Sequence, residues 1–360
     1  VSTLMTGATL VIFDGSPFTP GPEVLWEMAQ QEKVSIFGCS AKYISHLEKV
    51  NYLPGKEFDL APLKTMLSTG SPLSNDSFEF VYRDIKQDMC LSSIAGGTDI
   101  ISTFTLGCPI LPVYQGELQC IGLGMAVNIY DEQGEPINPE SGERGELVCT
   151  APFPSMPIGF YQDEGDKKYL SSYFERFDNI WAQGDYAQFI SHPVKFDDSE
   201  DIKSTSNKDF KNSQKNQQYL SMVIHGRSDA ILNPGGVRIG TSEIYRQVDK
   251  INAVMESVAV GQQWPKDSGD ERVILFVTLR EGKSLDDELV REIKHTIRVN
   301  TTPRHVPAVI LAVKDIPRTL SGKIVEVAVR EVIHNRAVKN TDSLKNPEAL
   351  DYFRNLAELA

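Results

Sequence analysis

The sequence predicts a mixed α/β protein built from two domains, and three observations lead to this fold class. Up to about residue 190, short apolar runs alternate with amphipathic stretches, a pattern typical of parallel α/β layers. A polar, charged stretch at 195–219 then interrupts the pattern. Beyond it, helices and strands follow one another in a self-contained α+β block. We therefore expect a larger domain over residues 1–229, a small domain over 230–340 and a tail helix over 341–360.

The composition is that of an ordinary globular protein and excludes several kinds of function. The 360 residues are 41% hydrophobic and 24% charged, which rules out a wholly disordered chain or a coiled coil. The net charge, 36 − 49 = −13, repels polyanions, so neither nucleic acid nor an acidic membrane is an expected main partner. No apolar run reaches the length of a membrane span. Five scattered cysteines without CxxC spacing favour a reducing, cytoplasmic location over a disulfide framework or a zinc site.

The first domain opens with the apolar run Thr9–Phe13, which the turn at Asp14–Pro17 bounds, and this pattern predicts a buried strand. Because the chain begins here without Met or a signal peptide, we interpret it as starting inside a folded domain, as a fragment of a longer protein would. Shorter strands between Gly and Pro turns at 105–190 predict a more β-rich portion. The alternating elements before it are a helix at 24–31, a strand at 35–38, a helix at 41–50 and a strand at 63–70.

The stretch 195–219 is nearly free of apolar residues and carries charges of both signs, which predicts an exposed, mobile loop. A basic binding patch is the alternative, and the mixed charge weighs against it. In the second domain, Ser284 is the predicted N-cap of a helix with acidic residues in its first turn. The elements expected there are a helix then a strand over 244–262, a strand over 273–282, helix 284–300, a strand over 308–317 and a helix over 322–337.

Two runs contain glycine turns with cations beside them. In Pro317–Ile324 a lysine follows a Ser-Gly turn just beyond a strand, and its ammonium group suits a phosphate or carboxylate oxygen. In His225–Ile244, Arg227 and Arg238 flank a Gly-Gly turn and could clasp a phosphorylated ligand. Taken singly, each run also fits a plain exposed turn or a surface hairpin.

Two further runs carry oxygen ligands. Ser93–Ile100 contains a Gly-Gly-Thr-Asp loop, in which Thr98 offers a hydroxyl to a phosphate and Asp99 a hard oxygen to Mg²⁺. A plain turn is the alternative interpretation of this loop. In Trp181–Tyr186, Asp185 follows a glycine, and a carboxylate can accept both hydroxyl protons of a ribose.

In this fixed order, the motifs resemble those of the adenylate-forming superfamily of acyl-CoA synthetases. The resemblance covers essentially the whole chain apart from 195–219. It implies a partial large adenylate-forming domain followed by the small C-terminal domain, and an enzyme that joins a carboxylate to ATP, releases pyrophosphate and transfers the acyl group from AMP to CoA. The matching runs are TGSPLS at 69–74, GGTDI at 96–100, GERGEL at 142–147, GD at 184–185, GRSDAILNPGGVRIGTSEIY at 226–245 and PRTLSGKI at 317–324.

The resemblance implies a nucleotide site. Thr98 would contact the α-phosphate as a catalytic group, and Asp99 would lie near Mg²⁺. Asp185 would hold the ribose hydroxyls together with Arg227, and Arg238 would lie near the phosphates. The full set of residues expected around the nucleotide is Gly70, Ser71, Pro72, Gly97, Thr98, Asp185, Arg227 and Arg238.

The resemblance also implies roles in the acyl and CoA steps. Lys323 would bridge the carboxylate and the α-phosphate during adenylation. Acetylation by an acetyltransferase would remove the positive charge of Lys323, and a deacetylase would restore it. Asp229 would be the hinge between the domains. Gly236 would leave a tunnel for pantetheine, and Arg298 would bind a CoA phosphate. Gly96 would keep the acid pocket open where acetate-selective relatives place a tryptophan.

The implied substrates are ATP, CoA and a short-chain acid, with acetoacetate favoured and no tightly bound prosthetic group. Another acid, such as acetate or propionate, is the first alternative. A catalytically silent nucleotide-binding module is the second, and the retained lysine and arginines weigh against it.

The sequence departs from the family pattern in two respects. The stretch 195–219 is longer than the usual connection, and the Gly- and Ser/Thr-rich loop that holds the β- and γ-phosphates is not found in residues 1–360. We therefore expect that loop upstream of residue 1, and we predict that the chain alone does not activate an acid.

Overall fold

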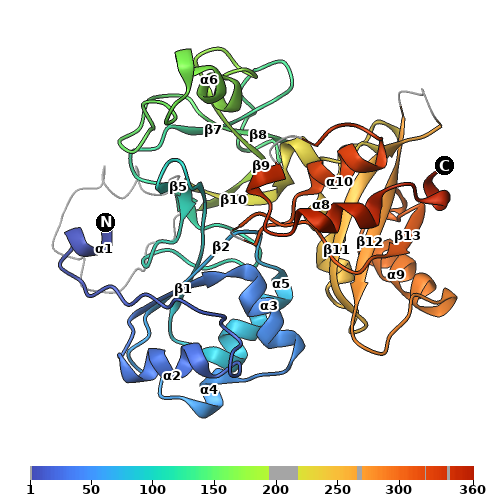
Figure 1. Cartoon of the computed structure of the whole chain (residues 1–360). Helices are drawn as coiled ribbons and strands as arrows, with labels where there is room; N and C mark the ends of the chain where they lie inside the picture. The colour runs from blue at the N-terminus through green and yellow to red at the C-terminus, as the bar shows by residue number, and fades with distance from the viewer. Residues whose placement is uncertain (1, 194–217, 266–269, 321, 339–340) are drawn as a thin grey trace.

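The computed structural model describes residues 2–193, 218–265, 270–320, 322–338 and 341–360. Figure 1 shows three groups of elements, one at the blue end of the chain, one in green and one from yellow to red. Most of the loop expected at 195–219 lies outside the described residues, whereas Gln218 and Tyr219 belong to a strand.

The first group is a parallel sheet covered by helices. Its strands follow the order β1-β2-β3, and β2 is parallel to both neighbours. Ser40 caps the helix after β1 by accepting a 3.1 Å hydrogen bond from the Tyr43 amide. Trp26, Ile44 and Met66 are fully buried in the core of this group. Its elements are α1 (Ser2–Met5), α2 (Val24–Gln31), β1 (Ile36–Ser40), α3 (Ala41–Lys49), α4 (Pro54–Glu57), β2 (Thr65–Thr69), α5 (Asn75–Phe80), the π-helical turn η1 (Val81–Ile85) and β3 (Cys90–Ser93).

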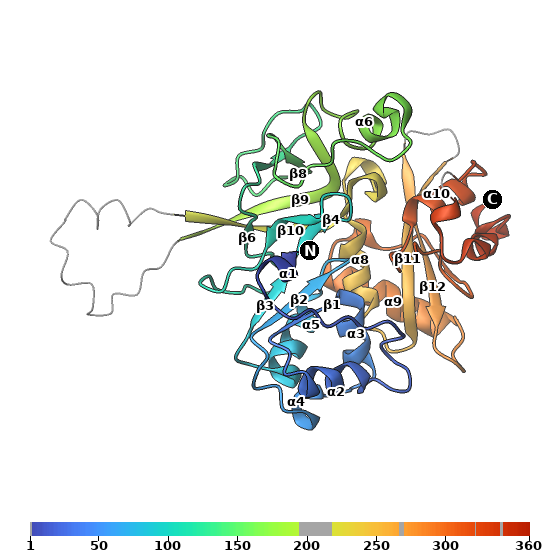
Figure 2. The ribbon, with the colours of Figure 1, turned by 60° about the vertical axis from the view of Figure 1, so that its left-hand side comes forward.

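The second group consists of two antiparallel sheets, with orders β4-β5-β6 and β10-β9-β8-β7. Its core contains Phe104, Leu147 and Trp181. The far ends of β9 and β10 extend away from the rest of the chain in Figure 2. The elements are β4 (Ala95–Gly97), β5 (Ser102–Leu106), β6 (Cys120–Ile121), β7 (Val127–Tyr130), β8 (Arg144–Cys149), η2 (Glu164–Asp166), α6 (Lys167–Tyr173), β9 (Trp181–Pro193) and β10 (Gln218–Arg227).

The third group is a three-stranded sheet with apolar clusters on both faces. Along β12, Val273, Leu275 and Val277 belong to one cluster, while Ile274 and Phe276 belong to the other. This is the period-two alternation of a strand buried on both sides. The elements are η4 (Ser228–Ala230), η5 (Pro234–Gly236), α8 (Thr241–Val248), β11 (Val254–Gln263), β12 (Glu271–Leu279), α9 (Asp287–Asn300), η6 (Pro303–His305), β13 (Val309–Ala312), α10 (Glu326–Ile333), η7 (Thr341–Ser343), η8 (Pro347–Phe353) and η9 (Ala357–Leu359).

The prediction of a buried strand at Thr9–Phe13 is wrong for this structure. The segment has no strand geometry, and Ile12 is 77% exposed. A strand is stabilised by a neighbouring strand, and no described residue pairs with this segment. The apolar run therefore has the composition of a strand, but composition does not show whether a partner strand lies beside it.

Two predictions about helix ends in the third group are also corrected. The N-cap of α9 is Asp286, whose side chain accepts a 2.8 Å hydrogen bond from the Leu289 amide, and not Ser284. The expected tail helix over 341–360 consists of short 3-10 turns. Leu350 and Phe353 are buried in the cluster on one face of the sheet, so the tail is fixed by packing and not by helix propensity. None of the helices in the part of the chain that the structure describes has both the length and the apolar character of a membrane span.

Candidate active site

The β9–β10 hairpin brings Asp185 and Arg227 together. The two residues are register partners in the antiparallel pair. Arg227 Nη1 lies 3.3 Å from Asp185 Oδ1 and donates a 2.9 Å hydrogen bond to the Gln183 carbonyl oxygen. Arg227 Nε lies 3.6 Å from Asp229 Oδ1, in the turn that begins the third group. The hairpin therefore places a carboxylate and a guanidinium side by side where the second group of elements meets the third.

Glu146, for which the sequence suggested no role, holds the turn before Asp185. Its side chain is buried, with an exposed fraction of 1% for the residue. Oε1 accepts a 2.6 Å hydrogen bond from the Gly184 amide, and Oε2 forms an ion pair with Arg176. Gly184 has a φ of +78°, and a Cβ at this position would lie 2.3 Å from Arg227 Nη2. The signal in the sequence was a carboxylate followed by the apolar residues Leu147 and Val148, because a buried carboxylate is costly unless it is paired.

The pKa of the Asp185 carboxyl group is raised from 3.8 to about 6. Burial is the largest cause, because it disfavours the ionised form, and the charge of Glu146 adds to it. Arg227 and Lys323 act in the opposite direction and lower the pKa. Lys323 belongs to the third group, and its charge favours the ionised form of Asp185 from there.

Lys323 is exposed and lies on a tight hairpin, which we call the lysine hairpin and define as residues 317–320 and 322–324. Arg318 and Ile324 form a β-bridge at its base. The Thr319 amide donates a 2.8 Å hydrogen bond to the Lys323 carbonyl oxygen, and the Lys323 amide donates to Thr319 Oγ1 at 3.1 Å. These bonds fix the backbone of Lys323, while its side chain is exposed to solvent.

The loop that contains Thr98 is connected to the same hairpin through Gln183. Gln183 accepts a 2.9 Å hydrogen bond from Trp181 Nε1 and donates a 3.5 Å bond to the Gly96 carbonyl oxygen. A Cβ at Gly97 would lie 3.1 Å from Gln183 Nε2, so the glycine allows a close approach. Thr98 follows directly and is exposed. The structure thus links the predicted phosphate loop to the strand of Asp185.

Gly96 does not have the geometry expected for a residue that opens an acid pocket. A Cβ there would lie 2.2 Å from the Ser102 carbonyl oxygen and 2.8 Å from Thr103 Cα. The glycine is therefore required by the close approach of β4 to the backbone of β5. A tryptophan at this position would have to displace β5 before it could fill a pocket.

Asp99 accepts a hydrogen bond from the Tyr173 hydroxyl, and the Tyr173 ring stacks on Trp181 with centroids 3.7 Å apart. Among the described residues, no three His, Cys, Asp or Glu side chains come together to hold a metal ion. The donor set therefore does not fit a magnesium ion held by the protein alone.

Arg238 lies apart from the Asp185 site. It forms an ion pair with Glu132, and its guanidinium carbon is 5.9 Å from the centre of the Tyr186 ring. Tyr186 and its neighbour Asp185 point to opposite faces of the strand. The other nucleotide candidates, Gly70, Ser71 and Pro72, follow the carboxyl end of β2, where Gly70 has a φ of +92°.

The candidates for the CoA step and the hinge lie in the third group. Gly236 has a φ of +75° and no neighbouring atom within 4 Å of a Cβ built there, so the space beside it is open. Arg304 holds the same turn by donating to the carbonyl oxygens of Pro234 and Gly235 at 3.0 and 2.8 Å. Arg298 is exposed in the last turn of α9. The Asp229 carbonyl oxygen accepts a 2.7 Å hydrogen bond from Arg330 of α10.

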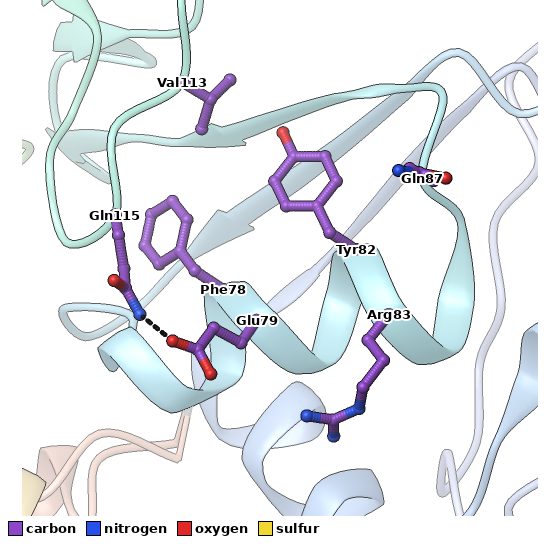
Figure 3. A pocket seen from close by; sticks show the side chains of 7 residues that line it. All are labelled: Phe78, Glu79, Tyr82, Arg83, Gln87, Val113 and Gln115. Carbon is purple, nitrogen blue, oxygen red and sulfur yellow. Dashed lines mark hydrogen bonds between the residues drawn. The ribbon is translucent and has the colours of Figure 1, made fainter.

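A hollow of about 440 Å³ on the first group does not coincide with this site. It lies beside α5 and η1, and Figure 3 shows Gln115 joined to Glu79 across its rim. Its lining contains none of the predicted site residues; it consists of Phe78, Glu79, Tyr82, Arg83, Gln87, Val113 and Gln115.

Comparison with known proteins identifies the class of protein that this fold and site define. The profile of the AMP-binding enzyme family matches residues 1–156, and that of the AMP-binding enzyme C-terminal domain matches residues 247–323. The benzoate CoA ligase from Burkholderia xenovorans LB400 shares the fold, with a TM-score of 0.66 at 18% identity over 91% of this chain and 57% of that one. The chain belongs to the family of AMP-binding, adenylate-forming enzymes.

Within this family the chain is similar to acetoacetyl-CoA synthetases along nearly its whole length. The protein from Rhizobium meliloti (strain 1021) is 50% identical over 358 residues, which are 99% of this chain and 50% of that protein. The Gallus gallus protein is 42% identical over 359 residues, or 100% of this chain and 49% of that protein. The structure of the Streptomyces lividans acetoacetyl-CoA synthetase matches with a TM-score of 0.82 at 36% identity, over 99% of this chain and 50% of that one. The chain thus spans about half the length of the curated relatives it matches.

We expect Gly184→Ala to weaken nucleotide binding by displacing the Arg227 guanidinium. The added Cβ would lie 2.3 Å from Nη2, and a φ of +78° is unfavourable for alanine. Affinity for AMP should fall about tenfold, a loss of about 1.4 kcal/mol, when measured by calorimetric titration. Gly165→Ala is the matched control, because Gly165 has a φ of +69° with open space around its missing Cβ. Equal losses of affinity in both variants would contradict the role of the close contact.

Proposed function

We propose that the protein activates acetoacetate with ATP, releasing pyrophosphate, and then transfers the acetoacetyl group from AMP to the thiol of CoA. The observation that carries the proposal is the 50% identity to an acetoacetyl-CoA synthetase over 99% of the chain. The pairing of Asp185 with Arg227, and the electrostatic influence of Lys323 on Asp185, support a nucleotide site that includes a cation from the third group.

In the proposed adenylation, a carboxylate attacks the α-phosphate, and both reactants are negatively charged. The Lys323 ammonium group would reduce this repulsion and stabilise the charge that develops in the transition state. Asp185 would accept hydrogen bonds from the ribose hydroxyls while Arg227 orients its carboxylate. Thr98 would donate a hydrogen bond to the α-phosphate.

Further roles are proposed for the hinge, the passage for CoA and the remaining nucleotide contacts. Asp229 is the proposed hinge, and its contact with Arg330 gives α10 a direct connection to it. The open space at Gly236 is compatible with a passage for pantetheine. Further nucleotide contacts are proposed for Gly70, Ser71, Pro72, Gly97 and Arg238, and a CoA phosphate contact for Arg298.

Magnesium would reach the site bound to ATP, because phosphate oxygens and water supply most of its ligands in nucleotide sites. Asp99 could contribute one further oxygen. We derive no step of the reaction through the ion.

Two proposals concern the protein in the cell. Acetylation of the exposed Lys323 would remove its charge and suppress adenylation, so an acetyltransferase and a deacetylase are proposed partners. A cytoplasmic location is supported by the cysteines, since all five lie in described segments and are free thiols.

The decisive experiment measures ATP–pyrophosphate exchange by the intact protein with acetoacetate, acetate and propionate. The proposal expects exchange with acetoacetate to exceed that with the other two acids. Faster exchange with acetate or propionate would instead support another short-chain acyl-CoA synthetase. Binding of AMP without exchange on any acid would favour a silent nucleotide-binding module.

We expect ribose binding to weaken as the pH falls through about 6, the raised pKa of Asp185. Above this pH the carboxylate is ionised and can accept both hydroxyl protons; below it, the protonated group loses acceptor capacity. Affinity for adenosine should therefore decrease about tenfold between pH 7.5 and pH 5. Adenosine avoids the titration of a phosphate, and 2′,3′-dideoxyadenosine is the control that lacks both hydroxyls. The same pH dependence for both ligands would exclude Asp185 as the ribose acceptor.

A further inference from the structure

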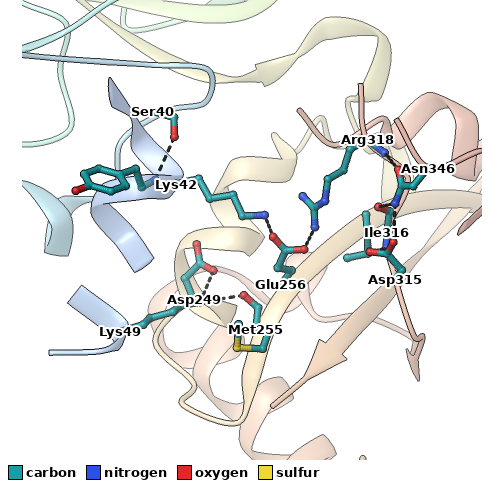
Figure 4. Close-up of polar contacts among 11 residues, drawn as sticks. Ser40, Lys42, Lys49, Asp249, Met255, Glu256, Asp315, Ile316, Arg318 and Asn346 are labelled. Atoms are coloured by element: carbon teal, nitrogen blue, oxygen red, sulfur yellow. Dashed lines mark hydrogen bonds and ion pairs between the residues drawn. The ribbon is translucent and has the colours of Figure 1, made fainter. Parts of the chain in front are cut away.

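A single carboxylate, that of Glu256, joins the first group of elements to the lysine hairpin. Glu256 lies on β11, and Figure 4 shows it between Lys42 and Arg318. One of its oxygens forms an ion pair with Lys42 Nζ of α3, and the other with the Arg318 guanidinium. Because Lys42 and Arg318 carry like charges, they approach each other favourably only with the carboxylate between them. We call these three residues the Glu256 bridge.

A second contact joins the same faces. Lys49, seven residues after Lys42 and therefore on the same side of α3, lies 3.1 Å from Asp249 Oδ1. Its ammonium group also donates a 3.4 Å hydrogen bond to the Met255 carbonyl oxygen. The side chains of Glu256 and Arg318 are each 16% exposed, and that of Lys49 is 13% exposed. Half-buried pairs of this kind are screened less by salt than surface pairs.

The position of Arg318 is transmitted to Lys323 through a stiff hairpin. The β-bridge between Arg318 and Ile324 closes one end, and the hydrogen bonds between Thr319 and Lys323 close the other. The base is tied down separately, because Asn346 Oδ1 accepts a 2.8 Å hydrogen bond from the Arg318 amide. Asn346 Nδ2 in turn donates to Asp315 Oδ2 at 2.6 Å. A shift of Arg318 relative to α3 would therefore move Lys323 as well.

We propose that Glu256, Lys42 and Arg318 are positioning residues for adenylation, because their bridge holds the hairpin that carries Lys323 against α3. The inference rests on the proposed function and extends it. The bridge stabilises this arrangement of the two parts, so it raises the population of the arrangement in which Lys323 can act.

The test separates the two half-reactions in the intact protein. Glu256→Gln keeps the shape of the side chain and removes its charge, and Lys42→Met removes one partner. Each should lower ATP–pyrophosphate exchange about tenfold, a typical coupling between sites, while conversion of supplied acetoacetyl-adenylate and CoA to the thioester is retained. Lys56→Met, at an exposed lysine of α4, is the control and should change neither rate. Equal loss of both half-reactions, or unchanged exchange, overturns the proposal.

Two further measurements keep the test independent of folding and of the substrate assignment. The double variant Lys49→Asp/Asp249→Lys should recover exchange that each single substitution loses, because it restores an ion pair of reversed sign. Carbodiimide should couple Lys42 to Glu256 in the unliganded protein, and mass spectrometry of the peptides detects the amide. Absence of this cross-link overturns the bridge. If the cross-link forms while the wild type exchanges pyrophosphate with no acid, the proposed function has failed and the bridge has not.

Discussion

Lys323→Ala should suppress adenylation about 10²–10³-fold, the size of effect seen when a preorganised group that stabilises transition-state charge is removed. The charge of this lysine lowers the pKa of the Asp185 carboxyl group. Two anions meet during adenylation, so the loss of the ammonium group raises the barrier of that step. Thioester formation from supplied acetoacetyl-adenylate involves no such encounter and should continue. Pyrophosphate release and thioester formation are measured separately in the intact protein.

Lys314→Ala is the matched control for Lys323→Ala, since it removes an exposed lysine shortly before the hairpin. It should leave both half-reactions unchanged. If Lys323→Ala slowed the two half-reactions equally, the lysine would act on folding or on a common step, and its assignment to adenylation would be wrong.

Glu146→Ala should be the most destabilising substitution in the site, with a loss of about 3 kcal/mol in the free energy of unfolding. The side chain is fully buried, accepts the Gly184 amide and pairs with Arg176. Alanine would leave a cavity, an unsatisfied amide and an arginine without its partner. The turn before Asp185 would lose its support, so the affinity for AMP should fall as well. Differential scanning calorimetry and AMP titration measure the two effects.

The GERGEL run supplies its own control, because Glu143 is an exposed carboxylate three residues before Glu146. Glu143→Ala should change neither the stability nor the affinity measurably. Similar unfolding temperatures for the two variants would show that the buried contacts of Glu146 do not contribute to the stability of the protein.

Local sequence patterns were sufficient to predict the positions of elements whose stability is mostly local or whose partners are close in the chain. Helices α2 and α3 lie within a residue of the segments that the apolar periodicity marked. The N-cap of α9 lies two residues beyond the expected one: Ser284 and Asp286 both have side chains that can cap a helix, and Asp286 forms the hydrogen bond. The run Thr9–Phe13 failed because a strand depends on a partner that composition does not specify.

The sequence by itself determined the class of the protein, through motifs whose glycines, lysine and carboxylates occur in a fixed order. It also determined which side chains can take part in the proposed chemistry, since residue type sets charge and hydrogen-bonding capacity. Only the tertiary structure decided how these groups are arranged. It paired Asp185 with Arg227 across a hairpin, bonded Glu146 to the turn before Asp185, set Gly96 against a neighbouring strand and connected Lys42 to Arg318 through Glu256. The physical reason is that such contacts join residues distant in the chain, and their energies depend on burial and separation, which no local pattern encodes.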